Sequence, residues 1–560
     1  MLDWVHPSFV LIAGALLIPV FAGRLRQAYL LLLPAVTLAL IASVSKGAFG
    51  TFQFLGMDLT MGRVDSLSLV FVYVFGIMLV IGAIYALHVT EALQHVAAFV
   101  YAGAALGVVF AGDLITLYVF WEVMAFASVL LIWCRRDPVS WSAGWRYVMV
   151  HAAGGVILLA GIILYYRQTG SIEFDAIRNV GPAFYLILVG FMINAAVPPL
   201  HAWLTDAYPE STITGAIFLS ALTTKTAVYT LIRGYPGTEM LVWFGAVMAI
   251  YGVVYAVLAN DIRRLLAYHI ISQVGYMVAG VGMGTAIALN GSASHAFTHI
   301  LYKGLLFMGA GAVIHMTGRS KLTELGGIYR YMPLTFLFYM VGAFSISAFP
   351  LFSGFVSKTM VVEAAAVDGR AAIWLMLSLA SAGTFLHTGL KLPYFTFMGK
   401  DSGLRPSEAP TNMLVAMGIA AFLCVFIGVY PDWLYALMPT LVDYHAYTAG
   451  HILWELQLLL FTGVGFFVLL KHVGGEAKIS IDTDWVYRWA LPVLVRRFMA
   501  SLRDAGRELA RWRDAVLQFF LERIFRYLGP RGIMARNWSI SGSALWVMVL
   551  LGGYLLVYYV

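Results

Sequence analysis

The stretch SHAFTHILYKGLLF, residues 294–307, places three titratable side chains four residues apart in an otherwise apolar segment. His295, His299 and Lys303 therefore share one face of a predicted helix. A charge inside a bilayer costs at least ~2.5 kcal/mol even on a lenient insertion scale, so the cluster indicates a relay for protons or ions. The alternative is a set of hydrogen-bonded polar groups that hold helices together.

The composition indicates a polytopic membrane protein. Of 560 residues, 61% are hydrophobic and 11% are charged, with a mean hydropathy of +0.85, whereas soluble domains have about 25% charged residues. Cys134 and Cys424 predict neither a disulfide framework nor a metal site. The net charge of +7 is concentrated near the C-terminus, which favours anionic lipids or partner subunits over nucleic acid. The apolar N-terminal run predicts a first span rather than a signal peptide.

Apolar runs of sufficient length predict an all-α fold with about sixteen membrane spans. They cover approximately residues 8–23, 28–45, 65–87, 93–111, 113–133, 145–166, 182–204, 211–232, 239–260, 264–286, 295–316, 333–365, 371–398, 412–436, 452–472 and 541–560. Alternate loops differ in their content of lysine and arginine. By the positive-inside rule, this asymmetry predicts that both termini lie outside the cytoplasm.

Two of the predicted spans are interrupted. The seventh contains Asn194 followed by Pro198 and Pro199, and the twelfth contains Pro350 and Gly354. Proline breaks a helix, and unwound backbone inside a membrane is tolerated only where protein or water satisfies it. Each break falls in the fourth helix of a five-helix unit, and an odd number of helices predicts inverted repeats of the kind found in transporters. Packing kinks are the alternative.

The C-terminal part has a different character. Between residues 491 and 528, apolar residues recur at helical spacing among arginines, which predicts a basic amphipathic helix about 57 Å long. A helix on the membrane surface that contacts anionic lipid is one interpretation. The chain is thus predicted to comprise six segments: residues 1–92 with three spans, 93–232 and 233–400 with the two repeats, 401–475 with two spans, 476–540 with the amphipathic helix, and 541–560 with a final span.

Charged residues inside the spans extend the relay hypothesis. Glu122 lies in the fifth span and Lys225 in the eighth, while Lys358 follows the second break. Lys391 matches Lys225 in the second unit, although it lies close enough to the end of its span to snorkel. Such groups can pass a proton by exchanging pair partners.

Several motifs carry a family resemblance. Residues 121–122 (WE), 198–210 (PPLHAWLTDAYPE), 260–277 (NDIRRLLAYHIISQVGYM), 294–307 and 349–358 (FPLFSGFVSK) resemble the antiporter-like subunits shared by respiratory complex I, Mrp-type cation/proton antiporters and membrane-bound hydrogenases. The resemblance covers roughly residues 65–400. It implies an ion-translocating fold whose proton path matches Glu122, Lys225, His295, His299, Lys303 and Lys358. The C-terminal part is similar to the lateral helix and final anchor found in the distal subunit of complex I, and in the large subunit of Mrp-type antiporters.

The first break departs from the family pattern. Asn194 stands where the family usually has a lysine, so Glu122 lacks its usual partner. Either Lys225 pairs with Glu122, or the first unit conducts differently, as a hydrated channel or through a Na⁺ site at Asn194. His201 adjoins the break and is a candidate path residue. The other isolated histidines, His151, His269, His315 and His387, are predicted to be packing groups, and Arg263 with Arg264 is predicted to be a cytoplasmic anchor.

The expected function is proton translocation within a multisubunit complex of the cell inner membrane, either Mrp-like or complex I-like. The expected partners are other membrane subunits, further antiporter-like subunits among them, with H⁺ and Na⁺ as candidate ions and with anionic lipids. No cofactor is expected because the sequence has no Rossmann fingerprint, P-loop or cysteine ligand set, so the chain is not expected to be an enzyme alone. In an NADH:quinone oxidoreductase-like or hydrogenase-like complex it would be a proton-pumping subunit. The alternatives are a proton-coupled uptake module for a small molecule such as inorganic carbon, a structural brace, and a haem-bearing membrane enzyme.

Overall fold

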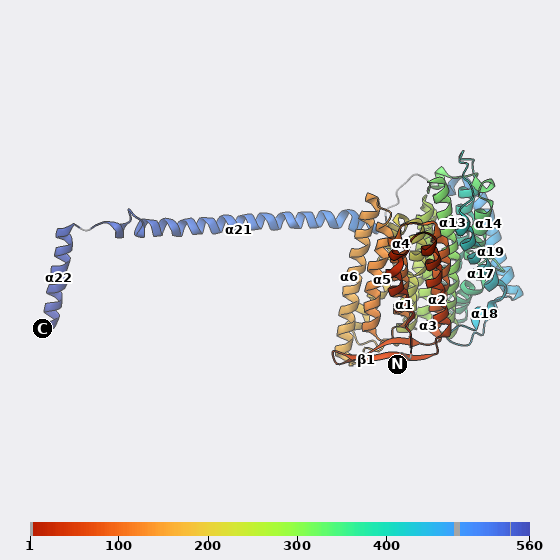
Figure 1. The fold of residues 1–560 in the computed structure, drawn as a ribbon, viewed down its shortest axis with the longest axis horizontal. Helices are drawn as coiled ribbons and strands as arrows, with labels where there is room; N and C mark the ends of the chain where they lie inside the picture. Colours follow the sequence, from red (N-terminus) through yellow and green to blue (C-terminus); the bar gives the residue numbers. More distant parts are fainter. Residues whose placement is uncertain (1–3, 475–481, 538) are drawn as a thin grey trace. The chain divides into compact units, whose positions relative to one another are not determined.

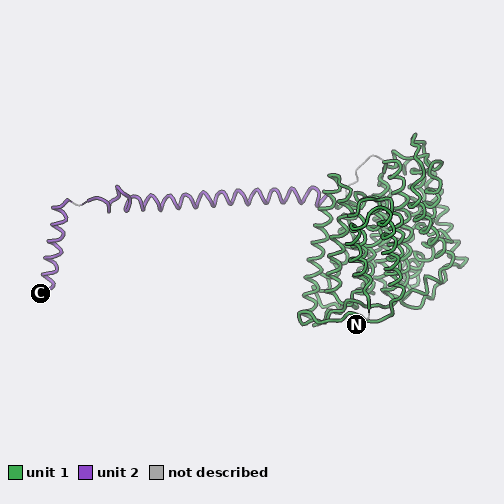
Figure 2. Tube along the Cα trace, viewed as in Figure 1, with its two compact units in different colours: residues 1–484 green, residues 485–560 purple. Residues whose placement is uncertain are grey.

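The computed structural model describes residues 4–474, 482–537 and 539–560. These residues form two compact units, Met1–Asp484 and Trp485–Val560 (Figure 2). The first unit contains all of the predicted relay residues. The finer division into six segments stays a prediction.

The first unit begins with three helices and a β-hairpin. The helices are α1 (Pro7–Leu17), α2 (Gly23–Ser43) and α3 (Ser66–Tyr85). Antiparallel strands β1 (Gly47–Phe54) and β2 (Met57–Val64) join through a two-residue turn in which Leu55 and Gly56 both have positive φ. That geometry belongs to a type I′ turn, which matches the twist of paired strands. The sequence predicts only helices, so the hairpin is an additional element of the described chain. Figure 1 shows it across one end of the helices.

The first predicted repeat forms seven helical segments. They are α4 (Ala92–Phe110), α5 (Leu114–Trp133), α6 (Pro138–Thr169), α7 (Pro182–Asn194), α8 (Ala202–Ala207), α9 (Ile213–Ala221) and α10 (Thr223–Gly234). Carboxylates of Asp113 and Asp137 cap α5 and α6 by accepting backbone N–H groups of the first turn. The predicted break separates α7 from α8, with Ala196 at positive φ between them.

The second predicted repeat and the two following spans are also helical. Their segments are α11 (Glu239–Leu258), α12 (Ile262–Met283), α13 (Ala286–Thr317), α14 (Pro333–Ile346), α15 (Ser353–Val367), α16 (Ala371–Thr384), α17 (Thr411–Val429), α18 (Pro431–Tyr435), α19 (Ala449–Val468) and α20 (Leu470–Val473). π-Helical turns follow α16 at Phe385–Lys391 and Tyr394–Met398. Short 3₁₀ turns lie at Ile18–Val20, Ala86–His88, Tyr208–Glu210, Leu322–Glu324 and Ile328–Arg330.

Thirteen helices of the described residues are long and apolar enough to cross a membrane. Three shorter apolar helices lie at Pro7–Val20, Pro182–Asn194 and Pro333–Ile346. Each of these lies at a predicted span, and the last two end at the predicted breaks. The multi-pass helical membrane fold is therefore confirmed, whereas the total of sixteen spans and the inverted repeats stay predictions.

The second unit contains two helices. α21 (Leu491–Leu528) spans the residues predicted for the amphipathic helix, and α22 (Ile540–Tyr559) is the predicted final span. A π-helical turn at Val486–Ala490 precedes α21, and a 3₁₀ turn lies at Ile533–Ala535. No residue of α21 is buried in this structure. Residues 475–481, at the start of the predicted segment, lie outside the described residues.

Candidate functional site

Three titratable residues of α13 lie in the interior of the first unit. His295, His299 and Lys303 are completely buried and occupy successive turns of one helix. The Lys303 ammonium lies 3.1 Å from Nδ1 of His269 on α12. A hydrogen bond between a lysine and an imidazole can carry a proton in either direction, depending on which group is protonated.

His387 extends this contact to a third segment. Its ring centroid lies 4.8 Å from that of His269, and Oγ1 of Thr384 lies 3.3 Å from Nε2 of His269. His387 belongs to the π-helical turn Phe385–Lys391, and π-helical turns occur frequently at functional sites. We call Lys303, His269 and His387 the Lys303 cluster.

Two members of the Lys303 cluster were not expected from the sequence. There, His269 and His387 are predicted to be packing groups, whereas the structure places both beside a buried lysine. Each lies four residues from a second polar residue, Gln273 and Lys391 respectively. That spacing is the signal that could have found them, because residues at this interval share a helix face.

A second group of polar contacts joins the N-terminal part of this α13 stretch to α15. Nδ1 of His295 lies 3.2 Å from Oγ of Ser357. The neighbouring Lys358 donates to the Ile346 carbonyl at 3.4 Å, where α14 ends. His299, between the two groups along α13, has no hydrogen-bond partner among the described residues. The two groups are therefore not linked by continuous hydrogen bonds in this structure.

Lys391 occupies the end of the π-helical turn. Its ammonium donates to the carbonyls of Val257 and Ala259 at the end of α11, the second at 3.3 Å. The residue is completely buried. Its ammonium therefore does not reach the surface, as a snorkelling side chain would.

Lys225 lies beside an interruption that the sequence does not predict. Leu222 separates α9 from α10, and the Lys225 ammonium donates to the Ser220 carbonyl at 2.6 Å. The lysine thus donates a hydrogen bond to a carbonyl near the end of α9, where carbonyls lack intrahelical partners. Among the described residues no ion pair joins Lys225 to Glu122, so this structure does not show the pairing considered from the sequence.

Glu122 instead occupies a space opposite α6. A Cβ at Gly155 would lie 1.9 Å from Oε1 of Glu122, so any side chain at this position would displace the carboxylate from its present place. In the described chain Oε1 has no hydrogen-bond partner, and the same holds for the amide nitrogen of Asn194. His151 of α6 lies near Asn194. The first half of the unit therefore contains a carboxylate oxygen and, at the break, an amide nitrogen that have no hydrogen-bond partner among the described residues.

His201, immediately after the break, contacts a residue far along the chain. Its Nε2 lies 3.1 Å from Oδ1 of Asp482, and Asp482 also accepts from the hydroxyls of Tyr268, at 2.6 Å, and Tyr251. Burial would raise the pKa of Asp482, but the hydrogen bonds from His201, Tyr251 and Tyr268 lower it well below its usual range. No sequence signal marked Asp482, because it lies 281 residues from His201.

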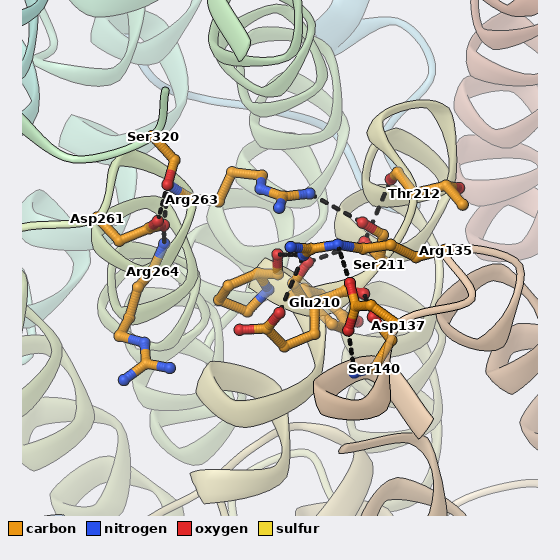
Figure 3. A network of polar contacts seen from close by, with 12 residues as sticks. Arg135, Asp137, Ser140, Glu210, Ser211, Thr212, Asp261, Arg263, Arg264 and Ser320 are labelled. Carbon is orange, nitrogen blue, oxygen red and sulfur yellow. Dashed lines mark hydrogen bonds and ion pairs between the residues drawn. The ribbon is translucent and has the colours of Figure 1, made fainter. Parts of the chain in front are cut away.

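A charged network supports the loop after the break (Figure 3). Arg135 pairs with Asp137 at 2.7 Å and with Glu210 at 2.9 Å. Arg263 is buried and donates to the Ser211 carbonyl at 2.9 Å. This side chain therefore satisfies a backbone carbonyl inside the protein, and the cytoplasmic anchor stays a prediction. Figure 3 shows the Arg264 side chain pointing away from the network.

Sequence comparisons identify relatives of this chain. Residues 111–386 match the family model described as "NADH:quinone oxidoreductase/Mrp antiporter, TM". A Na(+)/H(+) antiporter subunit of Alkalihalophilus pseudofirmus is 30% identical over 528 residues, which are 81% of this chain and 65% of that protein. Hydrogenase-4 component B of Escherichia coli is 29% identical over 436 residues, 68% of this chain and 64% of that protein. The chain thus spans just under two thirds of the length of these relatives.

Solved structures show the same fold. A chain of the Mrp complex from Dietzia sp. DQ12-45-1b superimposes with a TM-score of 0.71 and 23% identity, covering 81% of this chain and 98% of that one. A chain of the membrane-bound sulfane sulfur reductase, an archaeal respiratory membrane complex, gives a TM-score of 0.72 and 22% identity, covering 98% and 99%. The sequence matches and the shared fold together show that this chain belongs to the family of antiporter-like membrane subunits found in Mrp-type, complex I-like and hydrogenase-type complexes.

Proposed function

We propose that the chain moves protons across the membrane as one subunit of a multisubunit complex. The observation that carries this proposal is the Lys303 cluster, in which a completely buried lysine contacts one of two adjacent histidines. Buried ionisable groups inside a membrane protein are costly, and they are typical of proton and ion paths. Lys225, Lys358, Lys391, His295 and His299 supply further buried groups in the same unit.

The names of the relatives support the choice of ions and partners. The matches include a hydrogenase component and one subunit of a Na(+)/H(+) antiporter, and the solved neighbours are parts of multisubunit complexes. We infer that other membrane subunits, further antiporter-like ones among them, assemble with this chain. H⁺ is the transported ion, and in an Mrp-like complex it is exchanged for Na⁺. In this proposal the chain lies in the cell inner membrane with both termini outside the cytoplasm, and α21 contacts anionic lipids.

The test is ion flux in inverted vesicles that contain the whole complex, with internal pH and Na⁺ followed separately. We expect Lys358→Ala and Glu122→Gln each to lower proton movement at least about tenfold while the complex still assembles, because each removes a proton-carrying group. Lys400→Ala and Glu173→Gln are matched controls, since both residues are exposed. Proton flux that survives both test substitutions would mean that the chain is a structural brace. The Na⁺ trace separates an antiporter from a proton pump.

A further inference from the structure

A cavity of about 200 Å³ lies between α15, α16 and α19. Its lining includes Glu363, Ser378, Ser381, His451, Trp454 and Glu455. Such a mixture of carboxylates, hydroxyls and an imidazole suits water and a mobile proton better than an apolar ligand. None of these residues belongs to the relay predicted from the sequence.

Four buried polar atoms on the cavity wall have no hydrogen-bond partner among the described residues. They are Oε2 of Glu455, the hydroxyl oxygens of Ser378 and Ser381, and Nδ1 of His451. Glu455 is only 5% exposed, and the two serines are 7% and 2% exposed. A buried polar group without a partner is destabilising, and a carboxylate more so than a hydroxyl. These atoms therefore indicate a site that serves a mobile occupant.

Lys358 lies next to the cavity wall in sequence, because its neighbour Thr359 lines the cavity together with Glu455. The Lys358 ammonium is attracted by the Glu455 carboxylate, although no ion pair within 4 Å joins these two described residues. The ring centroid of Tyr276 lies 6.0 Å from the Lys358 ammonium, and the Tyr276 hydroxyl donates at 2.6 Å to the Leu377 carbonyl, next to Ser378 of the cavity wall. A buried lysine and a buried carboxylate that form no direct ion pair contribute little to stability. Proton exchange between them requires water or a side-chain rotation, and the cavity beside Glu455 provides the space for water.

The cavity lining also contains a second acid–base pair. Nε2 of His451 lies 3.2 Å from Oε2 of Glu363, and their side chains are 24% and 37% exposed. Exposure increases from Lys358, which is completely buried, through Glu455 to this pair. That order runs from the interior of the protein to its surface. The titratable groups that face Glu455 are thus Lys358, Tyr276, Tyr444, His451 and Glu363.

We propose that Glu455 exchanges protons with Lys358 and that its cavity is the aqueous opening of the second half of the relay. In the outward step the Lys358 ammonium gives its proton to the Glu455 carboxylate, leaving a neutral amine and a neutral carboxylic acid. The acid then releases the proton to water in the cavity, and Glu455 returns to the carboxylate. This inference rests on the proposed function and adds a proton-carrying residue and an exit to it.

The first test compares Glu455→Gln and Glu455→Asp in vesicles containing the whole complex. Glu455→Gln should lower proton flux at least about tenfold, because an amide cannot carry the proton. Glu455→Asp should retain part of the flux and shift its pH profile, a change that a purely structural residue would not produce. Glu173→Gln is the exposed control. If Lys358→Ala abolishes flux but Glu455→Gln leaves it unchanged, the inference is wrong while the proposed function stands. If Lys358→Ala and Glu122→Gln both leave flux intact, the proposed function itself fails.

A second measurement does not depend on transport. Dicyclohexylcarbodiimide modifies protonated carboxyl groups in apolar surroundings, and peptide mass spectrometry locates the adduct. We expect an adduct at Glu455 in the wild-type complex, and more of it in Lys358→Ala, because removal of a nearby cation favours the protonated acid. If the Glu455→Gln complex does not assemble, the labelling experiment by itself tests whether Glu455 takes up a proton near Lys358. No adduct between about pH 6 and about pH 9, or labelling that is the same in both proteins, would overturn the inference.

Discussion

Buried lysines of the first unit contact the carbonyl ends of helices. Lys225 donates to Ser220 near the end of α9, and Lys358 to Ile346 at the end of α14. Lys391 donates to Val257 and Ala259 at the end of α11. Carbonyls at helix C-termini lack intrahelical partners and carry partial negative charge, so they stabilise a cation without a carboxylate. Lys303 differs because its partner is an imidazole, which can also titrate.

This difference makes His269 the most informative residue of the Lys303 cluster. In His269→Gln the side chain can still form a hydrogen bond with Lys303, but it cannot take up a proton. We therefore expect proton flux to fall at least about tenfold, with assembly unchanged. The control is His315→Gln, because His315 is an exposed histidine at the end of α13. Equal flux in the two variants, measured in the same vesicles, would make His269 a packing residue.

At the scale of elements, interruptions of helices position the buried lysines. α14 ends at Ile346 and α15 begins at Ser353, with Ala348 and Leu351 at positive φ between them. Gly354 lets the two segments approach, because a Cβ there would lie 1.8 Å from the Ser345 carbonyl oxygen. The break thereby brings the end of α14 to Lys358 of α15.

Gly354→Ala should accordingly destabilise the protein. The atom that the new methyl group meets belongs to the backbone and cannot move aside cheaply, so we expect a loss of roughly 1–3 kcal/mol in the free energy of unfolding. Thermal unfolding of the purified complex measures it. Gly465→Ala in α19 is the matched control, since a Cβ there meets no atom within 4 Å. Identical melting curves for the two variants would mean that the close approach at the second break is not required.

At the scale of the whole molecule, the chain beyond the last span of the first unit returns to the first break. Asp482 contacts His201 beside α8, Tyr251 of α11 and Tyr268 of α12. Asp482, near the end of the first unit, therefore contacts three separate elements of that unit.

Asp482→Asn should weaken this attachment. The folded pKa of Asp482 lies below its usual range, so its contribution to stability is present above the ordinary carboxylate pKa of about 3.9 and is lost only as the pH falls further. We therefore expect a similar loss at about pH 5 and about pH 8, of roughly 1–3 kcal/mol. Thermal unfolding at both pH values tests it, with exposed Asp443→Asn as control. A loss that appears only at the higher pH would contradict the assigned pKa direction.

The sequence by itself determined the features that depend on local patterns. Hydrophobic run lengths located the membrane helices, prolines located the two breaks, and helical spacing located α21 at residues 491–528. Such signals involve residues that are close in the chain, and propensity and periodicity act over that range. The motifs also led to the correct family.

The tertiary structure decided which polar groups meet. It brought His269 and His387 to Lys303, placed Glu455 in the lining of a cavity that Thr359, next to Lys358, also lines, and joined Asp482 to His201. It also added the hairpin and the interruption at Leu222, whose sequence signals are weak. Contacts between residues tens or hundreds of positions apart depend on how helices pack and turn about their axes. Spacing within one helix shows which residues share a face, but only packing determines what that face meets.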